Sequence, residues 1–297
     1  MSDIQKPVLL VTGASGHLGR RVVELLLEAA SARVIATTRT PEKLADLAAR
    51  GVEVRAADFA DPASMLKAFA GADRLLLIST DAIGQRVAQH QNAIKAAEAA
   101  GVRHIVYTSI VNPTPDSRVF VAAEHRATEE ALAASNLGWT ALRNNIYADM
   151  LPRSLSQAVQ MGALYSAAGE GRTAYITRED CARAAAAALA SAFNGRRALD
   201  ITGPEAVSQA ELAAIASELS GRSIAYVPME LETLIQNMVG AGLPRPVAEI
   251  YASFDAGIAA NELSGVSSAF EELTGQKPTR VADFLAAHRD VFSATAV

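Results

Sequence analysis

The sequence has a single cysteine and no long run of basic or apolar residues. With Cys181 alone, the chain can form neither an internal disulfide nor a Cys-x-x-Cys metal or redox pair. The net charge is −5 over 297 residues and no basic run exceeds a pair, so nucleic-acid binding is not expected. No apolar segment approaches the length that crosses a bilayer, and the first residues lack a secretory-signal pattern. These absences predict a cytoplasmic globular protein in which Cys181 is a small core residue.

Several catalytic signatures are also missing. None of the six tyrosines has a lysine four positions later, the spacing at which a tyrosine donates a proton beside a helper lysine. Gly-Lys-Ser/Thr, His-Glu-x-x-His and Gly-x-Ser-x-Gly are absent as well. Phosphate-loop kinases, metalloenzymes and serine hydrolases are therefore not expected, and no metal site is predicted.

What the sequence does contain is a glycine-rich turn near its start. A continuous apolar run at 8–11 is typical of a parallel strand that is covered on both faces. After it, Gly13 permits a tight turn, Gly16 lets a pyrophosphate approach the backbone, and Gly19 lets a helix lie near the strand. Free amides and the positive dipole end of that helix favour a phosphate anion. The stretch predicts a dinucleotide site, with an unrelated glycine turn as the alternative.

Strands and helices alternate as far as residue 144, and this alternation predicts the fold. It forces parallel pairing through right-handed crossovers. We therefore expect an α/β protein with a doubly wound parallel Rossmann sheet, whose switch point lies between the first and fourth strands. Strands are expected at 8–11, 33–39, 52–58, 72–80, 102–109 and 139–143, and helices at 20–28, 41–50, 62–70, 84–100 and 121–135.

Beyond residue 150 the pattern loosens into short elements, which predicts a smaller C-terminal α/β lobe. We assign an NAD(P)-binding Rossmann domain to 1–150, with 176–202 expected to return to its sheet, and a mainly substrate-binding lobe to 151–297. Helices are expected at 178–193, 208–219, 230–241, 246–256 and 280–289, and strands at 198–202 and 223–227. A mobile loop is predicted over the nicotinamide end of the site, at Gly240, Gly242, Pro244 and Pro246.

The end of the second strand bears on the choice of cofactor. An acid at this position binds the ribose hydroxyls of NAD, whereas an arginine accommodates the extra phosphate of NADP. Arg39 occupies the strand end and no acid lies between Val34 and Thr40, so NADP(H) is favoured over NAD(H). A solvated loop arginine is the alternative.

Two further strand ends carry side chains that suit the cofactor. Asp58 and Phe59 follow the third strand, where they could edge and stack against an adenine ring. A loop aspartate and a core phenylalanine are the alternatives. Ser79 and Thr80 end the fourth strand beside the switch point, where ligands of open α/β sheets bind.

Hydrogen-bonding residues gather around the ends of the fifth and sixth strands. They are Ser109, His125, Asn144, Asn145 and Tyr147. His125 and Glu129 share a helix face, so the carboxylate could hold the imidazole's tautomer or raise its pKa; a solvent-facing pair of small energetic value is the alternative. Hydride delivery needs a cofactor, an aligned acceptor and excluded water, so a site with few acids and bases suits an easily reduced acceptor.

Several motifs along the chain carry a family resemblance. They are Thr12-Gly-Ala-Ser-Gly-His-Leu-Gly19, Leu75-Leu-Leu-Ile-Ser79, Gly84-Gln-Arg86, Tyr107-Thr-Ser109, Glu124-His125-x-x-Thr128-Glu129, Leu142-Arg-Asn144-x-x-Tyr147, Ala167-Ala168-Gly169-x-Gly171 and Thr177-Arg-x-Asp180. Together they resemble the NmrA-like branch of the atypical short-chain dehydrogenases, and within it the bacterial quinone reductases and triphenylmethane dye reductases. Because the motifs run almost the whole chain, the resemblance is far more specific than the glycine turn.

The resemblance implies a two-lobed protein that binds NADPH and transfers hydride directly to quinones or other flat conjugated acceptors, without flavin or metal. It implies that the cofactor is lined by Gly13, Ala14, Ser15, Gly16, His17, Leu18, Gly19, Arg39, Ser79, Thr80, Arg143, Asn144, Asn145, Ile146 and Tyr147. Strand-end reasoning adds Asp58, Phe59 and Ser109. Asn144 and Tyr147, near the nicotinamide, are catalytic candidates. So is His125, on the helix where many members of the family carry a lysine.

The partner expected from this resemblance is a small aromatic or quinone-like substrate, with neither nucleic acid nor membrane. The oligomeric state is left open, with a homodimer among the options. The same family contains regulators that bind a dinucleotide and carry out no demonstrated chemistry. A non-catalytic NAD(P)-sensing protein is therefore the alternative function.

Overall fold

Seven parallel strands form the central sheet of the computed structural model, which describes residues 6–292. Their order is β3-β2-β1-β4-β5-β6-β9, and each neighbouring pair is parallel. The predicted Rossmann sheet is confirmed, and its order reverses at β1 and β4, where the switch point is expected. The strands are β1 (Val8–Val11), β2 (Arg33–Thr38), β3 (Glu53–Ala56), β4 (Arg74–Leu77), β5 (His104–Ile110), β6 (Gly138–Asn144) and β9 (Arg196–Ile201).

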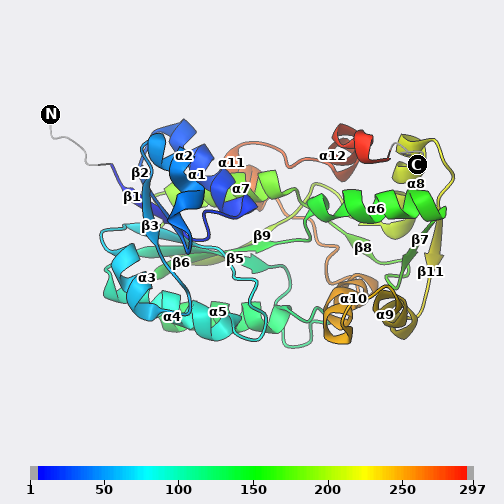
Figure 1. Ribbon diagram of the computed structural model, residues 1–297, viewed down its shortest axis with the longest axis horizontal. Helices are drawn as coiled ribbons and strands as arrows, with labels where there is room; N and C mark the ends of the chain where they lie inside the picture. The colour runs from blue at the N-terminus through cyan, green and yellow to red at the C-terminus, as the bar shows by residue number, and fades with distance from the viewer. Residues whose placement is uncertain (1–5, 293–297) are drawn as a thin grey trace.

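Helices cover both faces of this sheet (Figure 1), which explains why the central strands β1, β4 and β5 are buried along their whole length. Side chains alternate along each strand, so Leu9 and Val11 enter one core while Leu10 enters the other. One face carries α1 (His17–Ala29), α7 (Arg178–Ala190) and α11 (Ala269–Thr274); the other carries α3 (Pro62–Phe69), α4 (Arg86–Ala99) and α5 (Ala122–Ala134). Cys181 is buried in the first core, as predicted, and burial raises the pKa of its thiol.

A second lobe lies beyond the carboxyl ends of the strands, to the right in Figure 1. It contains two small sheets, β7 (Ala163–Ser166) parallel to β11 (Ala225–Pro228), and β8 (Arg172–Thr173) antiparallel to β10 (Val207–Ser208). Its helices are α6 (Leu151–Met161), α8 (Gln209–Ser220), α9 (Leu231–Gly240), α10 (Arg245–Ala259) and α12 (Val281–Ala287), with 3-10 turns at Ala148–Met150 and Arg289–Phe292. The lobe has its own apolar clusters, one of α6, α8 and α12 and another of α9 and α10.

The chain passes between the two lobes more than once. After β7 and β8 it returns to the main sheet through α7 and β9, and β9 pairs with β6. It returns again near its end, where α11 packs against α7 and β9. The edge of the main sheet is therefore built by residues far beyond 150. How cofactor binding and substrate binding divide between 1–150 and 151–297 stays a prediction.

Three local expectations differ from the structure. The stretch after residue 150 is not a series of short elements, because α6 is an 11-residue helix that begins with Leu151 and Pro152. The predicted loop is shorter than expected and spans 241–244, because Gly240 ends α9 and Pro246 lies in the first turn of α10, where proline is tolerated; its mobility stays a prediction. The predicted helix at 41–50 is divided into a 3-10 turn (Pro41–Leu44) and α2 (Ala45–Ala49).

Candidate functional site

The glycine-rich turn between β1 and α1 is shaped for close backbone approach. Gly13 has a positive φ of 60°, which a residue with a side chain adopts only with strain. A Cβ at Gly19 would lie 2.5 Å from the Gly13 carbonyl oxygen, so the helix can approach the turn only with glycine there. At Gly16, the N-cap of α1, no side chain of residues 6–292 caps the helix. The first amides of α1 are thus available to an anion.

The other predicted residues of this turn contribute mainly through their backbone. Ala14 and Leu18 are buried in the core, and the Ala14 amide donates to the Thr37 carbonyl (3.0 Å). Ser15 Oγ accepts from Thr38 Oγ1 (2.9 Å), and His17 is exposed at the start of α1. The turn is therefore held against β2 while its open side faces outward.

A pocket of about 380 Å³ lies beside this turn, at the carboxyl ends of β1, β2, β3 and β4. It brings together eight of the predicted cofactor residues: Gly13, Ser15, Gly16, Arg39, Asp58, Phe59, Ser79 and Thr80. Sequence reasoning missed Gln89 on α4, where no strand end or glycine marked the position, and also Thr37, Thr38, Ala57, Ile78, Asp81 and Ala82. We call this cavity the dinucleotide pocket.

Arg39 and Asp58 both face this pocket, but they differ in whether they have hydrogen-bond partners. Arg39 is exposed, and its guanidinium makes no hydrogen bond or ion pair with any residue from 6 to 292. Asp58 already uses one carboxylate oxygen to accept the Ala60 amide (2.9 Å). Phe59 is half-buried and packs against the second core of the sheet. An uncompensated cation therefore stands at the end of β2.

At the end of β6, the buried Asn144 is paired with the half-buried Tyr147. Asn144 Nδ2 donates to Tyr147 Oη (3.2 Å), while Asn144 Oδ1 has no hydrogen-bond partner among residues 6–292. If the amide were turned over, its nitrogen would be the atom left without a partner instead. The guanidinium of Arg178 lies 5.6 Å from the Tyr147 ring centroid, and burial raises the pKa of the Tyr147 hydroxyl. One buried polar atom of Asn144 is thus free for a ligand.

Ser109, Glu129 and Arg143 lie on the opposite face of the sheet, beneath α5. Ser109 Oγ donates to Glu129 Oε1 (2.6 Å), and Arg143 donates to both carboxylate oxygens (3.0 and 2.7 Å). These contacts result from strand alternation, since Ser109 pairs in register with Arg143 and both side chains turn toward α5. The three side chains therefore serve as hydrogen-bond partners for one another.

The expected pairing of His125 with Glu129 is wrong in both of its forms. Glu129 binds Ser109 and Arg143, and neither residue is exposed to solvent. His125 Nδ1 instead lies 2.7 Å from the hydroxyl of Tyr107, on β5. Burial, with the nearby charge of Arg86, lowers the pKa of His125 well below its usual value rather than raising it. Its catalytic role stays a prediction.

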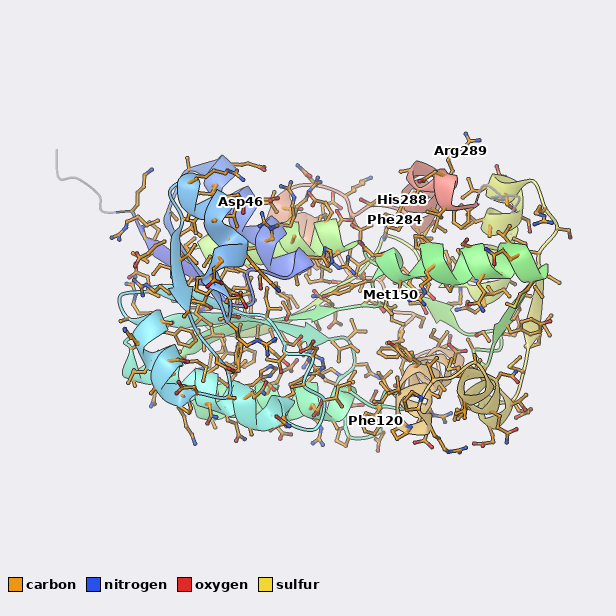
Figure 2. The ribbon with its side chains drawn as sticks, in the orientation of Figure 1. Asp46, Phe120, Met150, Phe284, His288 and Arg289 are labelled. Carbon is orange, nitrogen blue, oxygen red and sulfur yellow. The ribbon has the colours of Figure 1, made fainter. Side chains whose placement is uncertain are left out.

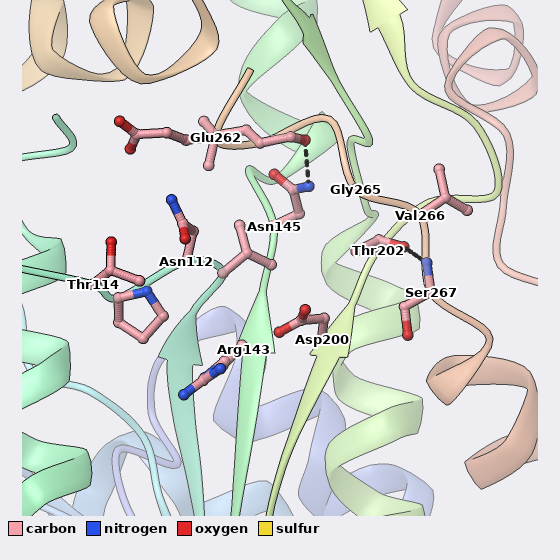
Figure 3. Close-up of a pocket in the computed structure, with 13 residues that line it drawn as sticks. Asn112, Thr114, Arg143, Asn145, Asp200, Thr202, Glu262, Gly265, Val266 and Ser267 are labelled. Carbon is pink, nitrogen blue, oxygen red and sulfur yellow. Dashed lines mark hydrogen bonds between the residues drawn. The ribbon is translucent and has the colours of Figure 1, made fainter. Parts of the chain in front are cut away.

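Arg143 and Asn145 line a second pocket, of about 280 Å³, at the ends of β6 and β9 (Figure 3). Asn145 Nδ2 donates to the Leu263 carbonyl (2.9 Å), and Asn145 Oδ1 accepts the Ile146 amide (2.8 Å). The Ile146 side chain packs against two apolar clusters, one in the second lobe and one that contains residues of both lobes. The structure therefore does not bring Arg143 and Asn145 to the dinucleotide pocket, and their contact with cofactor stays a prediction.

Two large apolar side chains are exposed where the lobes meet. Phe120, just before α5, is 56% exposed, and Met150, just before α6, is 53% exposed (Figure 2). The Phe120 amide donates to Ser253 Oγ on α10, so this segment contacts both lobes. Apolar surface is thus available near the ends of the main strands.

The part of the chain that the structure describes holds no group of three or more His, Cys, Asp or Glu residues placed to bind a metal ion. Within the same residues, no helix combines the length and apolarity needed to cross a membrane.

Comparison with known proteins places the chain among dinucleotide-binding proteins. A family model described as NAD(P)H-binding matches residues 13–192. Quinone oxidoreductase 2 of Escherichia coli is 36% identical over 277 residues, which are 93% of this chain and 96% of that protein. Its crystal structure complexed with NADPH matches with a TM-score of 0.90 at 35% identity, covering 94% of this chain and 99% of that one.

A dye reductase is similarly close. Citrobacter triphenylmethane reductase complexed with NADP(H) matches with a TM-score of 0.88 at 36% identity, covering 95% of this chain and 99% of that one. The chain therefore belongs to the NAD(P)H-binding family. The resemblance to the NmrA-like reductases is confirmed by these relatives.

Proposed function

We propose that this protein is an NADPH-dependent reductase that transfers hydride directly to quinone-like or other flat conjugated acceptors. The observation that carries the proposal is the dinucleotide pocket, in which the glycine turn and the uncompensated Arg39 face one cavity. Two solved relatives of the chain were crystallised with NADPH or NADP(H), and they are named as a quinone oxidoreductase and a triphenylmethane reductase.

The residues of the pocket fit NADPH by their own chemistry. The turn has no room for a Cβ at Gly19, and the free amides of α1 suit a pyrophosphate. Arg39 would bind the 2′-phosphate, since its guanidinium can donate two parallel hydrogen bonds. When bound, NADPH supplies the hydride.

Asn144 and Tyr147 would lie near the nicotinamide and orient it. The unpartnered amide atom of Asn144 is held in place by the bond to Tyr147, which is the arrangement expected of a preorganised contact. The exposed Phe120 and Met150 offer apolar surface to a flat acceptor at the junction of the lobes. Reduction of a quinone then also takes up a proton, which water can supply.

The finer parts of the proposal concern the setting of the enzyme. We place it in the cytoplasm, acting on a small aromatic or quinone-like molecule. The single cysteine supports this location, because a secreted protein of this size commonly gains stability from disulfides.

The proposal is tested by acceptor-dependent oxidation of NADPH with purified protein. A panel of benzoquinones, naphthoquinones, triphenylmethane dyes and azo dyes is used without oxygen, so that reduced quinone is not reoxidised. We expect turnover with part of the panel, and its loss in Asn144→Ala, while the dissociation constant for NADPH stays within about threefold of the wild-type value. Tight NADPH binding without turnover of any acceptor would overturn the proposal and favour the dinucleotide-sensing alternative.

A further inference from the structure

The segment between β4 and α4 forms one wall of the dinucleotide pocket. Residues 78–82 of this segment line the cavity, together with Gln89 of α4. The segment has no helical or strand hydrogen bonds of its own between Ile78 and Gln85. We call residues 78–85 the β4–α4 turn. Within it, the Ile83 amide donates to the Asp81 carbonyl and the Gln85 amide to the Ala82 carbonyl (both 2.9 Å), and the rest of its conformation is fixed by contacts with other parts of the chain.

Buried side chains hold the backbone of Thr80 from both sides. The Thr80 amide donates to His90 Nε2 (3.1 Å), and the Thr80 carbonyl accepts from Arg86 Nε (2.7 Å). His90 is fully buried and Arg86 is 7% exposed. Both residues belong to α4, so the helix grips the turn that precedes it. Neither residue lines the pocket.

Glu124 ties the same turn to α5. Its Oε1 accepts the Gly84 amide (2.7 Å), and its Oε2 lies 3.2 Å from Arg86 Nη1 in a largely buried ion pair. Thr128, one helical turn later, places its hydroxyl 2.9 Å from His90 Nδ1. The motifs Gly84-Gln-Arg86 and Glu124-His125-x-x-Thr128, which lie 40 residues apart in the sequence, therefore form one cluster.

The hydrogen bonds of this cluster define the protonation of His90. Thr128 Oγ1 donates to the Glu124 carbonyl (3.0 Å), so it accepts from Nδ1–H of the imidazole. Nε2 then carries a lone pair, which accepts the Thr80 amide. Burial lowers the pKa of His90 to about 3, in keeping with a neutral ring. The ring bridges α5 and the turn only in this tautomer.

One residue of the held turn, Thr80, lines the pocket and carries a buried polar atom without a partner in the described part of the chain. Thr80 Oγ1 is buried and has no hydrogen-bond partner among residues 6–292, although the backbone of Thr80 is fully bonded. Ser79, beside it, has its amide bonded to Thr108 Oγ1 (2.9 Å). Because Glu124 neutralises Arg86, the cluster positions these hydroxyls without adding charge to the wall of the pocket.

We propose that Arg86, His90 and Glu124 are positioning residues for NADPH, which hold the β4–α4 turn in the conformation that binds the dinucleotide. The inference rests on the proposed function only in its choice of ligand. The three residues act through Thr80 and Gly84 and do not touch the cofactor. They therefore set the affinity for NADPH, whereas hydride transfer from bound NADPH does not depend on them.

The test compares variants that break or keep the grip on the turn. His90→Ala removes the acceptor of the Thr80 amide, whereas the amide oxygen of His90→Gln can replace Nε2. Glu124→Ala removes both contacts of the carboxylate. Glu130→Ala is the matched control, because Glu130 forms an exposed ion pair with Arg126 (3.0 Å) on the same helix.

We expect the dissociation constant and KM for NADPH to rise about tenfold in His90→Ala and Glu124→Ala, while kcat at saturating NADPH stays within about twofold. His90→Gln should recover affinity to within about threefold of wild type, and Glu130→Ala should match wild type. Amide exchange of residues 79–84 should be faster in the two disruptive variants without NADPH and should slow when NADPH is added.

Variants that lose thermal stability while binding NADPH as tightly as wild type would overturn the proposal, because the cluster would then serve folding alone. If His90→Ala does not fold, the NADPH affinities of His90→Gln and Glu124→Ala decide. Weak NADPH binding by His90→Gln together with wild-type binding by Glu124→Ala would overturn the proposal. Since binding is measured directly, a protein that binds NADPH but reduces no acceptor refutes the proposed function, and the same dissociation constants still decide the role of the cluster.

Discussion

The polar groups at the strand ends fall into two sets: those that lack a hydrogen-bond or ion-pair partner within the described residues and those that have one. Arg39, Thr80 Oγ1 and the Asn144 amide each retain a group without a partner among residues 6–292. Ser109, Glu129 and Arg143, beneath α5, bond to one another. His125 likewise bonds to Tyr107 in the same layer. We call these the open set and the closed set.

The difference shows that residue type and strand-end position do not by themselves mark chemistry. Arg143 and Asn144 are adjacent in the sequence, yet strand alternation sends one to α5 and the other to the α7 face. A buried polar group that already has its partners stabilises the fold, whereas one that lacks a partner is available to a ligand. The open set is therefore the better guide to the site.

The largest expected effect separates two tyrosines: Tyr147, which bonds to Asn144 of the open set, and Tyr107, which bonds to His125 of the closed set. Tyr147→Phe removes the hydroxyl that holds Asn144, so kcat should fall about 100-fold, as when a preorganised hydrogen bond is lost. Tyr107→Phe removes the hydroxyl bonded to His125, and kcat should stay within about threefold while unfolding becomes about 1 kcal/mol easier. Steady-state kinetics and denaturant unfolding measure both. Equal losses of kcat would abolish the distinction between the sets.

The next effect concerns the open cation at the end of β2. Arg39→Ala should weaken NADPH relative to NADH by about 50-fold, because a charge-assisted contact to the 2′-phosphate is lost. Dissociation constants for both cofactors measure the ratio. Arg33→Ala, on the same strand and exposed, is the control. An unchanged ratio of the two dissociation constants would show that the unpaired Arg39 does not bind the 2′-phosphate.

The smallest expected effect is the response of the buried histidines His90 and His125 to acid. The folded-state pKa of His90 is about 3 and that of His125 is well below its usual 6.5, so the unfolded chain takes up protons first as the pH falls. Stability present above about pH 6.5 is then lost toward lower pH, by about 2 kcal/mol at pH 5 for His90, and His125 acts in the same direction. Thermal unfolding at pH 7.5 and pH 5 should show this loss.

His90→Gln should remove one histidine's share of that pH dependence. The exposed His288→Gln controls for the substitution itself. Carboxylates with lowered pKa values, such as Asp46 and Glu179, respond only in more acidic solution, so they do not contribute to this window. A wild-type protein equally stable at both pH values would contradict the description of His90 and His125 as buried and neutral.

The sequence predicted most of the fold because its signals are local. Apolar runs, glycine turns and helix caps repeat along the first 144 residues, and alternation leaves one topology. The helix α6 was not predicted, because Pro152 and the nearby glycines suggest breaks in a helix. Proline is nevertheless tolerated in a first helical turn. The helix α11 was not predicted, because six residues are too few to show a clear helical period of apolar residues.

The site was predictable where the contact is made by the backbone or at a strand end. Gly13, Gly16 and Arg39 fall in this class, and all three line the dinucleotide pocket. The pairing of Glu129 was not predictable, since a helix spacing of four residues says nothing about an arginine on a neighbouring strand. Glu129 bonds to Arg143 and not to His125 because the tertiary structure brings β6 against α5.

The return of β9 to the main sheet sets a condition on biosynthesis. Until residue 201 of 297 has left the ribosome, β6 has an open edge with unpaired amides and carbonyls, and α11 follows only near residue 274. The main sheet therefore reaches its full seven strands only late in translation. An exposed strand edge at that stage is a point at which a nascent chain can pair wrongly with another or recruit a chaperone.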